Sequence, residues 1–264
     1  MSAPENSAVK IDNYPIKSYK LGSGIVHEVQ LYDIPGLFAP NAITARFARY
    51  VDGLADKVVF DIGTGTGILA IWAALKGARK VYAVDPFYRH IEAARLNAAL
   101  NGVDSVVEFF MGKNFVCTEE SHIRADVILG DVSGIAEKVA RALGWYPEGV
   151  PAGGYDGATN IVDLIKGAPN CLNENGKLYF PVSMGLSDDT KIKRTSQEYF
   201  ENVEPVRPMP ANFPLTEEEA EKIREAYGGK MPYFIKLIER KGKLWWQGQI
   251  FKATRPKAAT IHAE

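Results

Sequence analysis

The sequence is poor in cysteine. Only Cys117 and Cys171 occur among its 264 residues. Two cysteines are too few for a disulfide scaffold or for a zinc site built on cysteine ligands. His27 and His90 have no Asp, Glu or Cys at the spacing typical of metal ligands, so we expect no metal site. We interpret the two cysteines as buried thiols.

The chain also lacks an excess of charge of one sign and any long apolar run. It carries 31 Lys and Arg against 32 Asp and Glu, and its basic residues are scattered. No global field therefore attracts nucleic acid or anionic membranes. No apolar run approaches the roughly 20 residues of a membrane helix, and the start, MSAPENSAVKIDNYP, does not resemble a secretory signal. We predict a cytoplasmic protein without a membrane partner, set nucleic acid aside as a partner and leave a homodimer open.

What the sequence does contain is an alternation of short apolar runs and longer segments with helical spacing. The expected strands are residues 57–61, 80–84, 106–111, 126–130 and 177–182, and the expected helices are residues 67–76, 87–101 and 158–171. Steps of this length imply parallel strands joined by right-handed crossovers. Asn175-Gly176 is the expected turn between the last of these helices and the strand that follows it.

The C-terminal part has a different pattern. Residues 207–215 are punctuated by prolines, and Thr216 opens a helix with the spacing of a capping box. Residues 233–240 and 244–252 are expected to form a hairpin. We therefore predict an α/β fold, a Rossmann-like doubly wound mixed sheet of about seven strands with an antiparallel C-terminal edge. Residues 1–40 are the expected N-terminal extension or lid, and residues 41–264 a single domain.

The stretch VVFDIGTGTGILAI, residues 58–71, places a glycine turn between a strand and a helix. Such a turn lets the backbone approach a ligand closely and points the helix N-terminus at it. The spacing is G-x-G-x-G, and Ile68 occupies the place of the last glycine of the dinucleotide fingerprint. A P-loop is excluded because no G-K-[ST] follows. Asp61 would repel a phosphate but suits a ligand that carries an ammonium group.

A second acid ends the next expected strand, in VYAVDPF, residues 81–87. Asp85 is positioned to accept both hydroxyls of a ribose. Pro86 and Phe87 are candidates for the apolar wall of an adenine site. A ribose, an adenine and an amino-acid ammonium together describe S-adenosylmethionine (SAM).

DIGTGTG resembles motif I of the class I SAM-dependent methyltransferases, and VYAVD resembles their acidic second motif. The resemblance extends over residues 36–182. It implies that the glycine loop holds the methionyl part of SAM, that Asp85 binds the ribose, and that residues after the third strand meet the adenine. The candidate residues of the loop and the adenine site are Asp61, Gly63, Thr64, Gly65, Gly67, Ile68, Asn114 and Phe115.

A finer resemblance is to the branch that includes the protein-release-factor glutamine methyltransferases. LFAPNAIT, residues 37–44, resembles their segment that closes over the cofactor, which implies contacts from Phe38, Pro40 and Thr44. GGYDGATNIVDLIKGAPNCLNENGKLYF, residues 153–180, is similar to their GG-x-DG stretch with the following helix and strand. Where that branch carries N-P-P-Y, this sequence has Asp131-Val132-Ser133-Gly134, so methylation of a planar amide is not implied.

Asp131 and Tyr32 are the candidate catalytic residues. Asp131 follows the fourth expected strand, where open α/β sheets bind ligands. Its carboxylate can accept a proton from an acceptor, hold an ammonium or contact the cofactor. The alternative is that Asp131 caps the next helix. Tyr32 belongs to the extension expected to cover the site, where an aromatic face contacts a sulfonium or simply packs.

These features predict a SAM-dependent methyltransferase that transfers the methyl group in line to an oxygen or nitrogen of a small-molecule acceptor. A second hypothesis is displacement at another carbon of the sulfonium, by aminocarboxypropyl transfer or cyclisation, with release of methylthioadenosine. A third is methylation of a protein or RNA. The non-enzymatic alternative is a SAM fold kept as a binding module.

Overall fold

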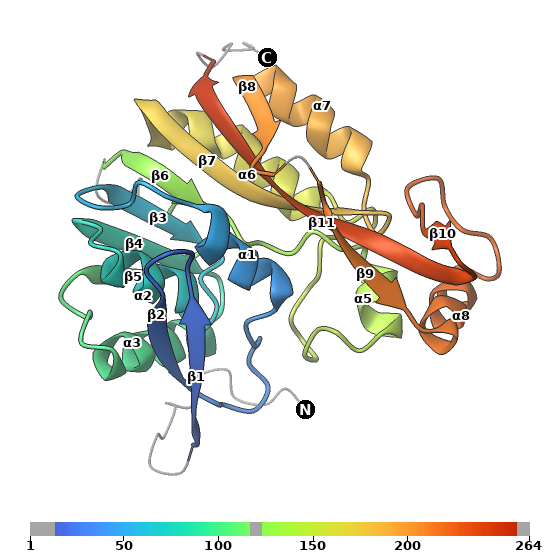
Figure 1. The fold of residues 1–264 in the computed structure, drawn as a ribbon, viewed down its shortest axis with the longest axis horizontal. Helices are drawn as coiled ribbons and strands as arrows, with labels where there is room; N and C mark the ends of the chain where they lie inside the picture. Colours follow the sequence, from blue (N-terminus) through green and yellow to red (C-terminus); the bar gives the residue numbers. More distant parts are fainter. Residues whose placement is uncertain (1–13, 117–122, 208, 258–264) are drawn as a thin grey trace. The chain divides into compact units, whose positions relative to one another are not determined.

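The computed structural model describes residues 14–116, 123–207 and 209–257 (Figure 1). Cys117 lies outside the described residues. The chain divides into two compact units, residues up to 131 with 170–179, and residues 132–169 with 180–264. Each unit is described by itself. The predicted division into a lid, residues 1–40, and one domain, residues 41–264, stays a prediction.

The first unit is built on a parallel sheet whose strands follow the order β7-β6-β3-β4-β5 (Figure 1). Every neighbouring pair along this order is parallel. The chain runs from β3 through β4 to β5 and then returns to the other side of β3, so the strand order reverses between β3 and β6. Such a reversal opens the ligand crevice of doubly wound sheets. The strands are β3 (Val58–Ile62), β4 (Lys80–Asp85), β5 (Val107–Met111), β6 (Ala125–Leu129) and β7 (Leu172–Met184).

Helix α2 (Ile68–Leu75) connects β3 to β4, and α3 (Tyr88–Leu100) connects β4 to β5. Residues 68–73 of α2 are all buried, as expected for a crossover helix between the sheet and other elements. The helices approach closely where α2 begins, because a Cβ on Gly67 would lie 3.0 Å from the Cβ of Ala94 on α3. Gly67 also has φ +86°, which disfavours any side chain.

An antiparallel hairpin precedes the sheet in the first unit. It consists of β1 (Ile16–Leu21) and β2 (His27–Tyr32), and α1 (Ala42–Tyr50) follows it. Asn97 of α3 and Asn101, the C-cap of that helix, hold β2. Asn97 Oδ1 accepts the backbone N–H of Tyr32, and Asn101 Oδ1 accepts that of Gln30, both at 2.9 Å.

The second unit contains the C-terminal part of β7 and a long strand, β11, that pairs antiparallel with β8, β9 and β10. Its elements are α5 (Glu137–Ala142), α6 (Thr159–Cys171, of which residues 170 and 171 belong to the first unit), α7 (Asp189–Tyr199), β8 (Phe200–Pro205), β9 (Ala211–Leu215), α8 (Glu217–Ala226), β10 (Ile238–Arg240) and β11 (Lys243–Pro256). Helix α7 packs beside β8, and α8 packs beside β9 and β11 (Figure 1).

The predicted fold class is confirmed: the central strands are parallel, and the C-terminal strands are antiparallel. The capping box at Thr216 is also present. Strand β9 was not predicted, and it lies inside the expected proline loop because residues 211–215 pair with residues 244–248, a partner remote in sequence. The first strand of the predicted hairpin, expected at residues 233–240, is shorter in the structure and consists of β10 alone.

The predicted turn at Asn175-Gly176 lies inside β7. The register between β6 and β7 shifts there, from Ala125 opposite Leu172 to Val127 opposite Lys177. Asn173 Nδ2 donates to Asp126 Oδ1 at 2.8 Å and thereby fixes the irregular stretch. Helix α6 therefore runs directly into the strand, and the turn residues form a bulge.

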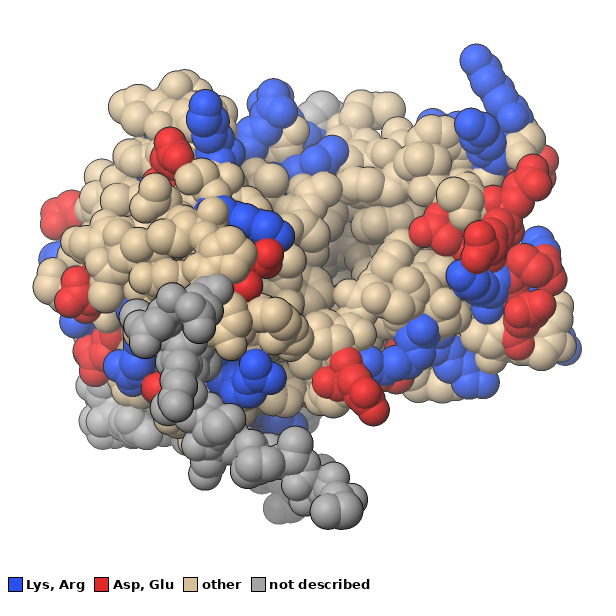
Figure 2. Space-filling model, turned by 90° about the horizontal axis from the view of Figure 1, so that it is seen from below, with Lys and Arg blue, Asp and Glu red and all other residues tan. Residues whose placement is uncertain are grey.

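Among the described residues, no helix combines the length and the apolar character required to span a membrane. Figure 2 shows basic and acidic side chains interspersed over the visible face, as the scattered charges of the sequence predict. The predicted cytoplasmic location stays a prediction.

Candidate functional site

Three carboxyl groups lie at the carboxyl ends of adjacent strands in the first unit. Asp61 is the last but one residue of β3, Asp85 ends β4, and Asp131 follows β6 by two residues. β3 and β6 flank the point where the strand order reverses. The predicted site residues from three separate parts of the sequence therefore meet at one edge of the sheet.

The glycine loop folds back on the neighbouring strand. The N–H groups of Gly63 and Thr64 both donate to the carbonyl of Val84, at 2.8 and 3.0 Å, and Gly67 N–H donates to the carbonyl of Thr64 at 2.9 Å. Gly65 has φ +55°, and among the described residues no atom lies within 4 Å of the place where its Cβ would be. The loop backbone is therefore open to a ligand at Gly65.

Asp85 connects this loop to α3. Its Oδ2 accepts the N–H of Gly65 at 3.0 Å, and its Oδ1 accepts the N–H of Phe87 at 3.0 Å. His90 Nδ1 lies 2.9 Å from the same Oδ1. Both side chains of this pair are buried. Asp85 thus shapes the loop from within. Its contact with a ribose stays a prediction.

Asp61 is a buried carboxyl group that is only half satisfied. Thr64 Oγ1 donates to its Oδ2 at 2.6 Å, whereas Oδ1 has no hydrogen-bond partner among the described residues. Burial raises the pKa of Asp61 to about 7; the Thr64 hydrogen bond opposes this rise, and the negative charge of Asp131 adds to it. An unpartnered oxygen of this kind is a place for a cationic or hydrogen-bonding ligand group.

The burial of Asp61 predicts how the stability of the unliganded protein depends on pH. The pKa is raised in the folded state, so the contribution of Asp61 to stability is greatest below its unfolded value near 4 and is lost as the pH rises to about 7. Between pH 5 and pH 8, wild type should lose about 3 kcal/mol of unfolding free energy relative to Asp61→Asn. Urea unfolding at several pH values measures this difference. Asp104→Asn, at an exposed position, is the control, and a constant difference between wild type and Asp61→Asn would contradict the prediction.

Asp131 is half-buried and bound to α1. Thr44 Oγ1 donates to its Oδ2 at 2.7 Å. Thr44 also closes the capping box of α1, with Asn41 as the N-cap. Burial raises the pKa of Asp131 to about 6, and the Thr44 hydrogen bond opposes the rise. The N-cap of α5 is Ala136, so helix capping does not explain Asp131.

The other predicted site residues differ in how far they are buried. Phe87 is half-buried and meets the ring of His90 edge-on at 5.3 Å, whereas Pro86 is exposed. Tyr32, Phe38 and Pro40 are half-buried; Ile68, the first residue of α2, is buried, as is Phe115, and Asn114 is exposed with φ +53°. Their roles stay predictions.

The sequence alone does not indicate a site role for three residues, His90, Asn97 and Asn101. The sequence predicts His90 to be a helix-face residue rather than a metal ligand, and it does not single out Asn97 or Asn101. Asn97 is fully buried, and its Nδ2 donates to the carbonyl of Thr66 in the glycine loop at 2.9 Å while its Oδ1 holds Tyr32. Polar residues seven apart on an alanine-rich helix, as His90 and Asn97 are, place two polar groups on one buried face, and this is the signal that was available.

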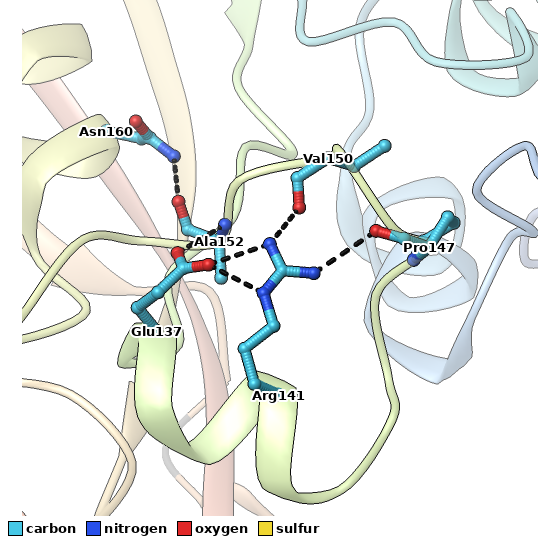
Figure 3. Close-up of polar contacts among 6 residues, drawn as sticks. All are labelled: Glu137, Arg141, Pro147, Val150, Ala152 and Asn160. Atoms are coloured by element: carbon cyan, nitrogen blue, oxygen red, sulfur yellow. Dashed lines mark hydrogen bonds and ion pairs between the residues drawn. The ribbon is translucent and has the colours of Figure 1, made fainter. Parts of the chain in front are cut away.

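The loop after α5 is held by side chains within the second unit (Figure 3). Arg141 donates to the carbonyls of Pro147 and Val150 at 3.2 and 2.5 Å and pairs with Glu137 on the preceding turn of α5. Glu137 Oε2 accepts the N–H of Ala152 at 2.8 Å, and Asn160 Nδ2 donates to the carbonyl of Ala152 at 3.0 Å. The loop is thus tied at both ends by side chains of two helices.

Comparisons with known proteins agree with this geometry. The family model of the ribosomal protein L11 methyltransferases (PrmA) matches residues 49–147, which include the glycine loop and all three carboxyl groups. The matched segment resembles the class I SAM-dependent methyltransferases. SAM is the cosubstrate of this class.

Individual relatives resemble this chain over part of its length. A ribosomal protein L11 methyltransferase of Serratia proteamaculans is 32% identical over 122 residues, 45% of this chain and 39% of that protein. A protein arginine N-methyltransferase of Oryza sativa subsp. japonica is 46% identical over 80 residues, 30% of this chain and 20% of that protein. The chain spans only 26–39% of the length of the first three curated relatives that it matches.

A solved structure supports the fold. The 16S rRNA N2 G1207 methyltransferase of T. thermophilus, in complex with AdoMet and guanosine, has a TM-score of 0.55 and 13% identity, and the match covers 96% of this chain and 52% of that one. At this identity the likeness is one of fold alone.

These comparisons correct the partners predicted for this chain. The prediction of a small-molecule acceptor is wrong, because the relatives are named for protein acceptors and a structural neighbour for an RNA. The prediction rested in part on near-neutral charge, and the missing N-P-P-Y counted against a protein or RNA acceptor. Neither feature reports on the acceptor, since a macromolecule can be bound through local surfaces without a global field.

Proposed function

We propose that this chain transfers the methyl group of SAM to an amino group of a protein. The observation that carries the proposal is the match to the ribosomal protein L11 methyltransferase family over residues 49–147, because it includes Asp61, the glycine loop, Asp85 and Asp131 together. The matched relatives at 30% identity or more are named for protein acceptors, which favours a protein over an RNA.

The cofactor part of the proposal rests on charge and on open hydrogen-bonding groups. The unpartnered Oδ1 of Asp61 accepts the ammonium group of SAM. A cation next to a buried carboxyl group stabilises its ionised form, so SAM binding lowers the pKa of Asp61 from about 7 and releases a proton near neutral pH. The backbone at Gly65 lies along the methionyl part, and Asp85 binds the ribose.

The acceptor part of the proposal rests on Asp131. Its pKa of about 6 leaves the carboxylate ionised at neutral pH, where it attracts an amino group and accepts a proton from it. The Thr44 hydroxyl occupies one side of Oδ2 and thereby orients the group. The sulfonium is already activated, so alignment of nitrogen, methyl and leaving sulfur supplies most of the rate gain.

Methyl transfer from radiolabelled SAM tests this proposal. The acceptors are purified ribosomal protein L11 of Serratia proteamaculans and whole ribosomes of the same bacterium, with protein and RNA separated after the reaction. Asp85→Ala is the inactive control. We expect label in protein, with S-adenosylhomocysteine as the by-product and a mass gain of whole methyl groups on the acceptor.

The other outcomes contradict the proposal in different ways. Label only in the RNA fraction would make the acceptor a nucleic acid. Methylthioadenosine formed from SAM alone, above the level of the Asp85→Ala control, would mean that the aminocarboxypropyl arm is used. SAM binding without turnover on either acceptor would favour a binding module.

A further inference from the structure

His90 is a buried titratable group to which the proposed reaction assigns no task. It lies in the first turn of α3 and is 4% exposed. Its Nδ1 lies 2.9 Å from Oδ1 of Asp85, which is 5% exposed. Within the described part of the chain, no group of three or more His, Cys, Asp or Glu is arranged to hold a metal, so metal binding does not account for it.

The chemistry of the pair determines where the proton lies. An ionised carboxylate oxygen only accepts hydrogen bonds, so the His90 nitrogen that faces it carries the hydrogen. The ring is held in this orientation by the edge-on contact with Phe87 at 5.3 Å. The side chain of a residue in the first turn of a helix points back towards the helix N-terminus, which here is the carboxyl end of β4.

The hydrogen bonds of Asp85 leave its two oxygens unequal. Each carboxylate oxygen offers about two lone-pair positions. Among the described residues, Oδ1 accepts from Phe87 N–H and His90, whereas Oδ2 accepts from Gly65 N–H. Oδ1 is therefore filled and Oδ2 keeps one position for a ligand. The prediction that Asp85 takes both ribose hydroxyls needs a second open position, and His90 occupies it.

We propose that His90 is a positioning residue for the cofactor: its Nδ1–H fills Oδ1 of Asp85, fixes the carboxylate plane and leaves Oδ2 to bind one ribose hydroxyl. This inference rests on the proposed SAM site. If His90 has this role, α3 contributes directly to the affinity for the cofactor. Asp85 then makes a single hydrogen bond to the ribose, through Oδ2.

Three substitutions at one position test the donor. Asn carries an amide where His carries Nδ1, Leu carries a methyl group there, and Gln reaches only the place of Nε2. Binding of S-adenosylhomocysteine is measured by titration calorimetry on folded variants, with circular dichroism as the folding check. We expect His90→Leu and His90→Gln to bind about tenfold more weakly and His90→Asn to stay within about threefold of wild type.

Kinetics separate positioning from catalysis. In His90→Leu the KM for SAM should rise about tenfold while kcat at saturating SAM stays within about twofold, since the residue touches no reacting atom. A fall in kcat alone, or equal losses in the Asn and Leu variants, would overturn the inference.

A measurement on the wild-type protein covers the case in which the Leu variant does not fold. The 2′-deoxy and 3′-deoxy forms of S-adenosylhomocysteine are compared with the parent compound. We expect one of them to bind about tenfold more weakly and the other within about threefold. Equal, large losses for both would show that Asp85 binds both hydroxyls. If wild type does not bind S-adenosylhomocysteine, or Asp85→Ala binds it normally, the proposed SAM site fails; normal binding by His90→Leu with loss in Asp85→Ala rejects only the role of His90.

Discussion

Replacement of Asp85 by Ala should weaken SAM binding at least about a hundredfold while the protein stays folded. The carboxylate accepts the N–H groups of Gly65 and Phe87 and the Nδ1–H of His90, so its removal deletes a ligand contact and also frees the glycine loop. Hydrogen bonds to a charged group contribute about 1.5–3 kcal/mol each, and one ribose contact together with the lost preorganisation gives this magnitude. Titration calorimetry with SAM measures the effect.

The matched control for this variant is Asp104→Ala. Asp104 is exposed and follows α3, so it changes the net charge by the same amount without touching the site. Its affinity for SAM should equal that of wild type. An unchanged affinity in Asp85→Ala would remove the ribose assignment, and equal losses in both variants would assign the effect to net charge.

Replacement of Asp131 by Asn should lower kcat about ten- to a hundredfold and leave SAM affinity within about threefold of wild type. The amide neither accepts the proton of an amino group nor attracts its cationic form. In wild type, kcat/KM for SAM should rise with pH through an apparent pKa of about 6, because kcat/KM reports the unliganded enzyme and its protonated carboxyl group is inactive. This limb should disappear in Asp131→Asn. Steady-state rates from pH 5 to pH 8 test both statements.

Thr44 supplies the control for Asp131. Thr44→Val keeps the shape but removes the hydroxyl that donates to Asp131 Oδ2, and Thr44→Ser keeps the hydroxyl. We expect a several-fold loss of kcat in the Val variant and near-normal rates in the Ser variant. If Asp131→Asn changed only thermal stability, Asp131 would be a structural residue. Another group would then have to bind the amino group of the acceptor.

The two acids of the cofactor site differ in how they are satisfied. Both carboxylate oxygens of Asp85 accept hydrogen bonds from protein donors. Asp61, in contrast, has one oxygen without a hydrogen-bond partner among the described residues, and burial raises its pKa to about 7. Asp61 therefore destabilises the empty protein at neutral pH, and a bound cation relieves that cost. This is the pattern expected where a group is retained for ligand binding at the expense of stability.

Local features of the sequence were enough to predict the glycine turn, the acids at the ends of two strands and the parallel order of the sheet. Each depends on short-range constraints: positive φ at Gly63, Gly65 and Gly67, apolar runs of strand length, and crossovers long enough for helices. The fold class and the cosubstrate follow from these features.

The acceptor could not be predicted in the same way. Near-neutral composition and the sequence Asp131-Val132-Ser133-Gly134 led to a small molecule, which the relatives overturn. Acceptor recognition depends on the surfaces that loops form, such as the loop held by Arg141 and Glu137, and on which groups those surfaces expose. Net charge is a sum over all of these surfaces, so it does not indicate which acceptor any one of them binds.

The sequence by itself determined the fold, the strand-end positions of Asp61 and Asp85 and the nature of the cofactor, because these follow from periodicity and turn chemistry within a few residues. Only the tertiary structure decided that Thr44 binds Asp131 across 87 positions, that His90 fills one oxygen of Asp85, and that Asn97 joins β2 to the glycine loop. The physical reason is that the partner of a buried polar group is chosen by how elements pack, and packing brings together residues whose separation along the chain carries no signal.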